Sequence, residues 1–510
     1  MSASGVSRRW VLSTLAAVAA SSRARAKSVA QSQWDLIIVG AGTAGLPAAL
    51  FAARRGARVL VLEKGAQVGG TLWFSGGQMS AAGTRLQKAK GIEDSPAEHL
   101  ADIMRISRGT ANEDIVRLAV ENAAGTVDWL ESAGLTFGPG FPVAGTGHEP
   151  YSHARVWGAP DRGLAILRVL EKELTTAPAS LSVLKSTEVV EPILDRRGAV
   201  LGVIAKDEAG VRRDFRAPHT VLASGGYMAN TALFQSHAQR RPEIPCRRLA
   251  MNTGVGIDIG RSAGGWVRGR ENYLCDFGSI PADLEIPSPE LARSIHHPER
   301  REPWEIIVNR AGKRFLAEDL GSVDEREHML LTQPDNRYWL VFDEDILRNA
   351  PPLVRGAPPG ELRDWTTQEL ADAFGVAPAF TSAATLEQLA VGAGIDPRNL
   401  VATVDEYNAG QASGHDSLGR THMPRPIKRA PFYAIRHQGA TLIGVAGLAV
   451  DDKLRVTKPD GAPVAGLYAA GELLGNGTLS GKAFCAGMMV TPALSFGRWL
   501  GENLPLAKRG

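Results

Sequence analysis

Leu36-Ile37-Ile38-Val39-Gly40-Ala41-Gly42-Thr43-Ala44-Gly45 is the stretch that decides the fold of this chain. A short apolar run enters a glycine-rich turn, and a helix of small residues is expected over 44–55. A second apolar run, 58–62, ends in the acid Glu63. A strand, a GxGxxG turn, a helix, a strand and a terminal acid in this order predict a βαβ unit that binds a dinucleotide.

The glycines of this turn have separate physical roles. Gly40 permits the tight turn, Gly42 lets the backbone approach a pyrophosphate, and Gly45 lets the helix lie close to the strand. The positive N-terminus of the helix then faces the phosphates. Glu63 can accept hydrogen bonds from a ribose hydroxyl. The alternative is an ordinary βαβ unit with chance glycines.

A second glycine-rich run, Gly69-Gly70-Thr71-Leu72-Trp73-Phe74-Ser75-Gly76-Gly77, follows Glu63 closely and leaves no room for the third strand of a standard NAD domain. Together the two runs resemble the opening of FAD-containing oxidoreductases. The second run is similar to the flavin-edge loop of the superfamily of fumarate reductases, succinate dehydrogenase flavoproteins and 3-ketosteroid 1-dehydrogenases. Three later blocks agree with this resemblance: Val221-Leu222-Ala223-Ser224-Gly225-Gly226, Asn252-Thr253-Gly254-Val255-Gly256, and Gly466-Leu467-Tyr468-Ala469-Ala470-Gly471-Glu472. One departure is Val255, which stands where many relatives have Asp.

The resemblance implies an α/β fold with an FAD-binding doubly wound domain, Rossmann-like and of the glutathione-reductase type, and an inserted α+β capping domain. Residues 34–265 are expected to form the first part of the FAD-binding domain, and 431–505 its second part. Residues 266–430 are rich in Pro, Arg and Glu and are expected to form the cap. The active site is then expected in the cleft between the cap and the flavin.

The cofactor implied by the resemblance is FAD, and no metal site is predicted. No His occurs within 70–77, where succinate dehydrogenases attach the flavin covalently, so we expect non-covalent FAD. A helix that begins near Pro492 is expected to point its N-terminus at the flavin pyrimidine ring. The residues expected to bind FAD are Gly40, Gly42, Ala44, Gly45, Glu63, Lys64, Gly70, Thr71, Ser75, Gly76, Gly77, Val189, Ser224, Gly225, Glu472, Val490 and Thr491.

The substrate half of the chain matches neither archetype of the superfamily. Fumarate reductases grip a dicarboxylate with an Arg where this chain has Thr478. The 3-ketosteroid dehydrogenases have a Tyr where this chain has Ser322. The resemblance implies Arg326 as a catalytic candidate, because it follows the Gly-x-Arg-Phe segment at 312–315. It also implies Tyr433 and His437, which come from the side where the superfamily places substrate residues. Lys482 and His153 are further candidates. The alternatives are an exposed helical arginine, a packing tyrosine, a surface histidine on a strand and a salt-bridging lysine.

The flavin of this superfamily exchanges a hydride with one carbon of the substrate while a protein group exchanges a proton with its neighbour. The resemblance therefore implies an FAD-dependent oxidoreductase acting on a CH–CH bond next to a carbonyl, as a dehydrogenase of a cyclic ketone or keto acid. One alternative is a periplasmic ene-reductase of an unsaturated, fumarate-like acid. Another is a flavin electron-transfer subunit without a substrate of its own.

The N-terminal segment carries an export pattern. Ser7-Arg8-Arg9-Trp10-Val11-Leu12 is a twin-arginine signature, and Ala24-Arg25-Ala26 offers a cleavage site. We expect residues 1–26 to be a signal peptide, the mature chain to be periplasmic, and its electron partner to be a quinone or a cytochrome. The apolar run is too short for a membrane anchor. Removing four arginines and no acid takes the net charge of +3 below zero, so no nucleic-acid partner is expected.

The cysteines of this 510-residue chain give no framework for disulfides or for a metal site. There are three, Cys246, Cys275 and Cys485, and no two of them form a CxxC pair. We expect all three to be ordinary buried thiols.

Overall fold

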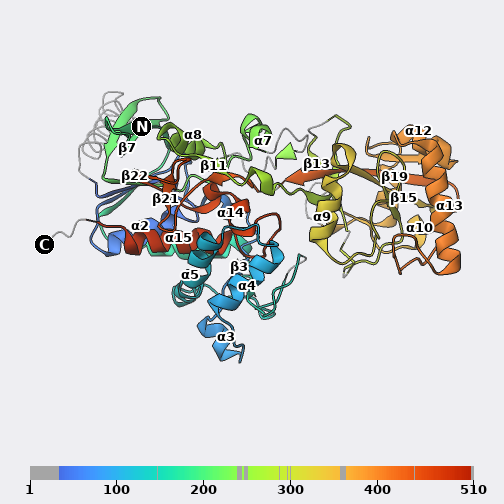
Figure 1. Cartoon of the computed structure of the whole chain (residues 1–510), viewed down its shortest axis with the longest axis horizontal. Coiled ribbons are helices and arrows are strands. Elements are labelled where there is room, and N and C mark those ends of the chain that lie inside the picture. Colours follow the sequence, from blue (N-terminus) through green and yellow to red (C-terminus); the bar gives the residue numbers. More distant parts are fainter. Residues whose placement is uncertain are drawn as a thin grey trace, which may run out of the picture.

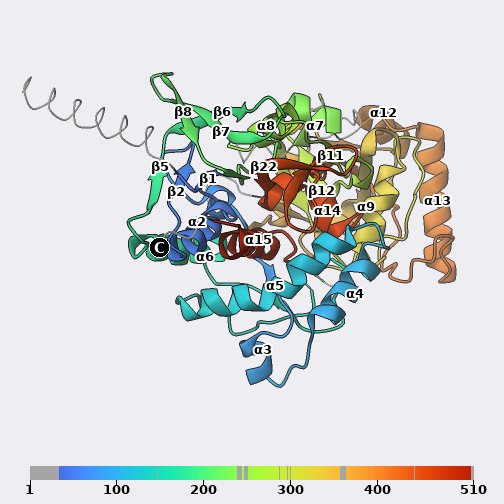
Figure 2. The same ribbon diagram turned by 60° about the vertical axis from the view of Figure 1, so that its left-hand side comes forward.

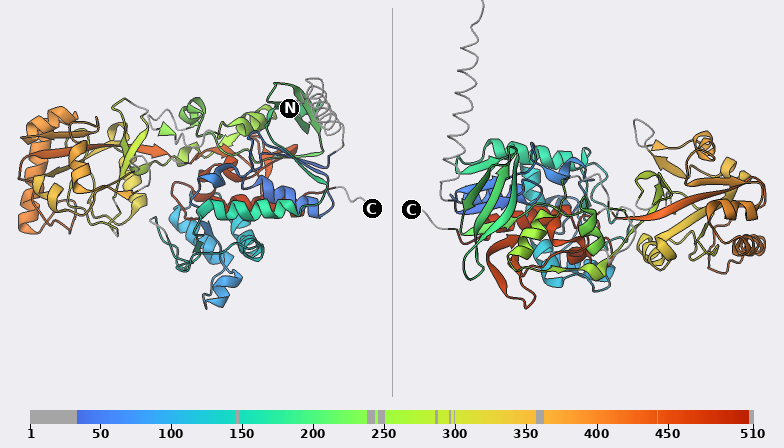
Figure 3. Two further views of the ribbon diagram at one scale, coloured as in Figure 1. Left: turned by 180° about the vertical axis from the view of Figure 1, so that it is seen from behind. Right: turned by 90° about the horizontal axis from the view of Figure 1, so that it is seen from above.

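The computed structural model describes residues 34–145, 148–237, 244–245, 251–285, 288–295, 297–298, 300–356, 363–441 and 443–506. The expected signal peptide, 1–26, and Cys246 lie outside these residues. The described part forms a larger domain and a smaller one set to one side of it, which we call the cap (Figures 1 and 3). No helix within the described residues is long and apolar enough to cross a membrane.

The core of the larger domain is a six-stranded sheet in the order β21-β22-β9-β1-β2-β5. Its strands are β1 (Leu36–Val39), β2 (Val59–Leu62), β5 (Leu181–Leu184), β9 (His219–Leu222), β21 (Arg455–Thr457) and β22 (Pro463–Ala469). All neighbours pair in parallel except β21, which runs antiparallel to β22. Every residue of β1 and β2 is buried, as continuous apolar runs in a parallel sheet require. The predicted βαβ unit is thus confirmed.

Two helices pack against each other beside this sheet (Figure 2). α2 (Gly45–Arg54) follows the glycine-rich turn, and α15 (Val490–Asn503) comes from the end of the chain. A Cβ on Gly497 of α15 would lie 2.1 Å from the carbonyl oxygen of Ala44. Glycine at that position therefore lets the C-terminal helix lie directly on the turn that opens the domain.

The remaining elements of the larger domain surround this centre. The side chain of Asn112 caps α5 (Glu113–Ser132) by accepting a hydrogen bond from the backbone N of Ile115. The strands β6 (Thr187–Leu194) and β7 (Val200–Asp207) form an antiparallel hairpin around Asp195–Gly198. The helices are α3 (Arg85–Ala89), α4 (Pro96–Ile106), α5 (Glu113–Ser132), α6 (Arg162–Thr175), α7 (Thr231–His237), α8 (Val255–Ser262) and α14 (Asn476–Ser480). The strands are β3 (Met79–Ser80), β4 (Val156–Trp157), β6 (Thr187–Leu194), β7 (Val200–Asp207), β8 (Arg212–Arg216), β11 (Val267–Arg268) and β20 (Gly447–Leu448).

The cap is built on a second sheet, crossed by the long strand β19 (Phe432–Thr441). The first half of β19 pairs with β18, and the second half with β10 and β12, while β15 runs along most of its length. The other cap strands are β10 (Ile244–Pro245), β12 (Asp276–Pro281), β13 (Glu290–Ser294), β14 (Ile306–Val308), β15 (Arg337–Asp343), β16 (Val354–Gly356), β17 (Arg363–Asp364) and β18 (Phe380–Ala383). Its helices are α9 (Val323–Leu331), α10 (Glu344–Asn349), α11 (Thr367–Ala373), α12 (Leu386–Ala393) and α13 (Pro397–Ser413).

The pairing of β19 moves the boundary that we expected at residue 431. Phe432 to Thr441 pair with cap strands, so the chain re-enters the larger domain only after Thr441. The strand β10 before residue 266 also pairs with β19. The cap therefore extends past residue 431 to include β19. At its other end, β11 pairs with β20 of the larger domain, so the main part of the cap begins with β12.

Candidate functional site

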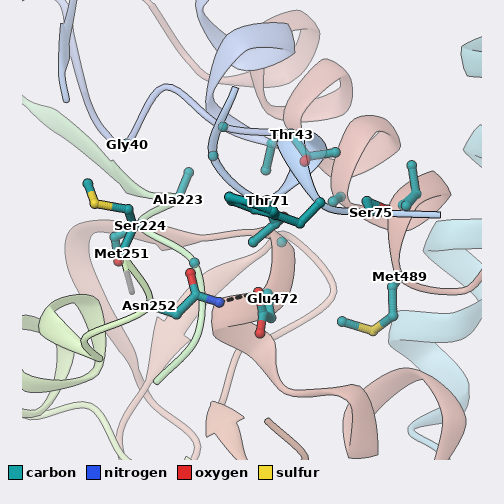
Figure 4. Close-up of a pocket in the computed structure, with 18 of the residues that line it drawn as sticks. Gly40, Thr43, Thr71, Ser75, Ala223, Ser224, Met251, Asn252, Glu472 and Met489 are labelled. Atoms are coloured by element: carbon teal, nitrogen blue, oxygen red, sulfur yellow. Dashed lines mark hydrogen bonds between the residues drawn. The ribbon is translucent and has the colours of Figure 1, made fainter. Parts of the chain in front are cut away.

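A cavity of about 440 Å³ opens at the carboxyl ends of β1, β2 and β9 (Figure 4). This is the edge of a parallel sheet where ligands bind in doubly wound folds. Its walls come from segments far apart in the chain: 39–44, 62–64, 70–78, 187–189, 223–225, 251–255, 471–472 and 484–493, with Ile443. The glycine-rich turn and the N-terminus of α15 thus face the same space.

Glu63 is held rigidly at one end of the cavity. Its Oε2 accepts a hydrogen bond of 2.7 Å from the backbone N of Ala41, and Oε1 accepts one of 2.7 Å from the N of Gly65. The neighbouring Lys64 forms an ion pair of 2.8 Å with Glu188. The carboxylate is therefore fixed by the turn itself, with lone pairs left for a ribose hydroxyl.

The turn leaves an open cradle for a ligand. A Cβ on Gly42 would find only Cα of Gly70, at 3.9 Å, whereas a Cβ on Gly45 would lie 1.9 Å from the carbonyl oxygen of Gly40. Gly42 therefore faces empty space, whereas the space beside Gly45 is filled by the backbone of the turn. Ser224 also lines the cavity, and its buried Oγ has no hydrogen-bond partner among the described residues. An open glycine cradle and an unpartnered buried hydroxyl fit a dinucleotide.

Glu472 closes the opposite wall. Its carboxylate accepts a hydrogen bond of 2.9 Å from Nδ2 of Asn252 (Figure 4). Burial raises the pKa of Glu472 above its usual value. The pair joins the block 252–256 to the block 466–472, which are distant in sequence.

The residues expected to bind the cofactor are brought together, with two exceptions. All of them line the cavity except Gly45 and Thr491. Gly45 acts through the turn, and Oγ1 of Thr491 accepts a 2.9 Å hydrogen bond from the backbone N of Ser80. Sequence reasoning missed further lining residues, including Thr43, Asn252, Thr253, Phe484 and Met489. Asn252 and Thr253 belong to the block 252–256, which resembles a flavin-binding segment of the superfamily, so their place in that block could have predicted their role.

Arg326 does not line the cavity. It lies in α9 of the cap with 2% of its surface exposed. Its Nε donates a 2.8 Å hydrogen bond to the carbonyl of Leu320, and its Nη2 donates to the carbonyl of Glu318. The guanidinium therefore holds the turn before α9, and the alternative of an exposed helical arginine is wrong.

Tyr433 and His437 are also packed inside the cap. The hydroxyl of Tyr433 donates a 2.6 Å hydrogen bond to Glu344. His437 shares a 2.6 Å hydrogen bond with Ser294 through Nε2 and stacks on the ring of Tyr338, with centroids 4.6 Å apart. Burial lowers the pKa of His437 to about 3. Both side chains are core residues of the cap sheet, and the structure does not bring them to the cavity.

The remaining candidates lie at the surface or are paired elsewhere. Lys482 is exposed and does not line the cavity. His153 is half-buried, and its Nδ1 lies 2.9 Å from Oγ of Ser152. Ligand atoms of Asp94, Glu98 and His153 lie within 4.8 Å of one another, but both Asp94 oxygens bind the buried Arg155.

Thr478 and Ser322 stand where fumarate reductases have an Arg and 3-ketosteroid dehydrogenases have a Tyr, and both hydroxyls bind other groups of the protein. Thr478 is buried, and its Oγ1 donates a 2.7 Å hydrogen bond to the carbonyl of Leu474. Ser322 caps α9 by accepting a 3.0 Å hydrogen bond from the N of Glu325, and its hydroxyl donates to Glu149 of the larger domain.

The parallel sheet, the open position at Gly42 and the fixed carboxylate of Glu63 together define a dinucleotide-binding fold. A family model for an FAD binding domain matches residues 35–486, and the chain belongs to this family. Its cofactor is FAD, which the unpartnered hydroxyl of Ser224 and the open position at Gly42 would fit.

Known proteins similar to this chain are named as reductases and dehydrogenases. It is 27% identical over 476 residues to a probable fumarate reductase, Ifc3, of Shewanella frigidimarina, which covers 92% of this chain and 74% of that protein. It is 27% identical over 563 residues to the 4-oxocyclohexanecarboxylate 2-dehydrogenase of Sinomonas cyclohexanicum, which covers 93% of each.

Solved structures show the same fold. The open conformation of a flavocytochrome c3 fumarate reductase superposes with a TM-score of 0.68 at 24% identity, covering 98% of this chain and 81% of that chain. The 3-ketosteroid Δ1-dehydrogenase from Sterolibacterium denitrificans superposes with a TM-score of 0.68 at 21% identity, covering 92% and 98%.

Proposed function

We propose that this chain is an FAD-dependent oxidoreductase that removes two hydrogens from a CH–CH bond next to a carbonyl, with a cyclic ketone or keto acid as substrate. Bound FAD supplies the hydride acceptor. The observation that carries the proposal is Thr478, which stands where a carboxylate-binding Arg would grip a dicarboxylate and whose hydroxyl is used on Leu474. A ketone needs no such cation.

A similar protein supports this substrate class. The relative named 4-oxocyclohexanecarboxylate 2-dehydrogenase matches this chain over 93% of both lengths. Full-length similarity with a cyclic keto acid dehydrogenase agrees with a site that lacks the dicarboxylate grip. We expect FAD to be held without a covalent bond, because 70–77 contains no His. The residues expected to hold it are those that line the cavity.

The second candidate is the reverse reaction, reduction of an unsaturated acid. It is favoured by the relatives named probable fumarate reductase and urocanate reductase, the latter 27% identical over 474 residues. In that case the exposed Lys482 is the residue we propose to hold the substrate carboxylate. An electron-transfer subunit is disfavoured because a full-sized cap, with its own sheet, accompanies the larger domain.

We further propose export by the twin-arginine route, with a quinone or a cytochrome as the electron partner. The twin-arginine signature at 7–12 supports this, as does the small-residue motif at 24–26. Fractionation of cells that express the full chain tests it. Mature protein beginning near Lys27 in the periplasm is expected, and the replacement of Arg8 and Arg9 by lysine should retain it inside.

Anaerobic mixing tests the reaction. Oxidised FAD-loaded protein is mixed with saturated cyclic ketones and keto acids, and reduced protein with enones and unsaturated acids. Fast bleaching of the flavin band by a ketone is expected. Reoxidation by unsaturated acids, with no bleaching by any ketone, would support the reductase instead. If nothing in either panel reacts, the proposed function is wrong.

A further inference from the structure

The loop over residues 148–153 meets the cap through Glu149, which accepts a hydrogen bond from Ser322, and it carries a histidine, His148, with no role so far. The ring of His148 contacts the ring of Phe484, with centroids 4.4 Å apart and planes inclined by 36°. Phe484 itself lines the cofactor cavity. The imidazole of His148 is therefore one side chain removed from the space that holds the flavin.

The imidazole also has an unused nitrogen. Nδ1 of His148 is shielded from solvent and has no hydrogen-bond partner among the described residues. Shielded polar atoms in proteins nearly always have a partner, because an unmade hydrogen bond costs about 1–3 kcal/mol. An open ring nitrogen in a side chain that contacts the wall of a ligand cavity indicates that a ligand completes it.

Three charged or titratable groups face this imidazole. Asp276 at the start of β12 and Glu149 on the same loop favour the protonated ring, whereas His297 of the cap disfavours it. Burial outweighs these charges and lowers the pKa of His148 below its usual 6.5. The ring is then neutral at pH 7 and can accept a proton, as a general base requires.

The alternative proton carriers are already occupied. The hydroxyl of Ser322, at the position of the ketosteroid-family Tyr, donates to Glu149. Arg326 binds backbone carbonyls of the cap, and Tyr433 binds Glu344. His148 differs from all three because it has an open nitrogen and its ring contacts Phe484, which lines the cavity.

We propose that His148 exchanges the proton of the reaction, through Nδ1, with the substrate carbon next to the carbonyl. This rests on the proposed function. In the oxidative direction, that C–H bond breaks and its proton moves to Nδ1. Its electron pair forms the new C=C bond as the neighbouring carbon loses its hydrogen with both electrons. Bound FAD is the oxidant. In the reductive direction, Nδ1–H returns the proton to the same carbon.

The first test compares His148→Gln with His153→Gln, which changes a half-buried histidine of the same loop that does not line the cavity. A ketone that bleaches the wild-type flavin is used for both variants. General bases contribute about 10²- to 10⁴-fold to the rate. The ketone should therefore bleach the flavin of His148→Gln at least about a hundredfold more slowly than that of the wild type, while the affinity for FAD stays unchanged. The control should match the wild type. Added imidazole should restore part of the rate to His148→Ala, which a purely structural role would not allow.

The second test reads the ring directly. In protein labelled with ¹³C-imidazole, one histidine signal that is absent from His148→Gln should titrate with a pKa below 6.5. That signal should shift when a saturated ketone binds.

The outcomes separate this assignment from the function. If the wild type is bleached and His148→Gln is bleached equally fast, or if the signal ignores the ketone, the assignment is wrong and the function stands. If the wild type reacts with no ketone, enone or unsaturated acid, the function is wrong and the assignment falls with it.

Discussion

Gly42→Ala separates the fold of the glycine-rich turn from its ability to bind FAD. The new methyl group would lie 3.9 Å from its nearest protein neighbour, Cα of Gly70, and the φ of Gly42 is outside the left-handed region. The protein without FAD should therefore keep its stability or gain about 0.4–1 kcal/mol. The methyl group enters the cavity, however, and takes space that the cofactor needs.

The magnitude follows from the cost of overpacking. One extra methyl group in a filled site costs about 1–3 kcal/mol, and 1.4 kcal/mol is tenfold in affinity. The Kd for FAD should therefore rise roughly fivefold to a hundredfold. Titration of the cofactor-free protein, followed by quenching of FAD fluorescence, measures it, and thermal unfolding of the same sample reports the fold.

Two variants frame this result. Gly140→Ala places its methyl group in open space away from the cavity and should change neither quantity. Gly45→Ala places it 1.9 Å from the carbonyl oxygen of Gly40 and should weaken both the fold and FAD binding. A folded Gly42→Ala protein with the wild-type Kd would refute the reasoning, because the cradle would then not face the cofactor.

Three further predictions concern the cap. The folded pKa of His437 is about 3, below the unfolded 6.5, so its contribution to stability is present above 6.5 and is lost as the pH falls toward 3; at pH 5 the loss is about 2 kcal/mol. Urea unfolding should show a smaller drop from pH 7 to pH 5 in His437→Gln, and an equal drop would contradict the burial argument. Tyr433→Phe loses the hydrogen bond to Glu344 and should cost about 2 kcal/mol in urea unfolding, with the rate of flavin bleaching unchanged; a tenfold slower rate would restore its catalytic role. Glu318 binds Arg314 and Arg420 in the interior, so Glu318→Gln should lower the free energy of unfolding in urea by about 3 kcal/mol. Glu369→Gln breaks an exposed pair and should change that free energy little. Equal effects of the two substitutions would argue against the buried network.

The cofactor half could be predicted from sequence because its signals are local. The turn at 40–45 requires glycine for steric reasons, and the acid at 63 follows one βαβ unit later. Asn112 and the Asp195–Gly198 turn are likewise read from neighbouring residues. Each of these features depends on residues within one supersecondary unit, so a single sequence contains the information.

The substrate half depends on contacts between distant segments. β19 belongs to the cap because it pairs with residues about a hundred positions earlier, which no local pattern shows. Arg436 and His437 point to opposite faces of that strand, and only the sheet decides which face is buried. Arg326 is flanked by two acids, yet the carbonyls of the preceding turn bury it. His148 has no local signal of a site, because Phe484, which its ring contacts, lies far along the chain.

The most direct test of the central claim uses a saturated cyclic ketone that bleaches the flavin, deuterated at the carbon one bond beyond the α-carbon. The rate of bleaching is then followed anaerobically. Hydride transfer from a CH–CH bond predicts a slower rate with the deuterated ketone and a product with a C=C bond beside the carbonyl. Equal rates without an unsaturated product would contradict the claim that this chain oxidises that bond.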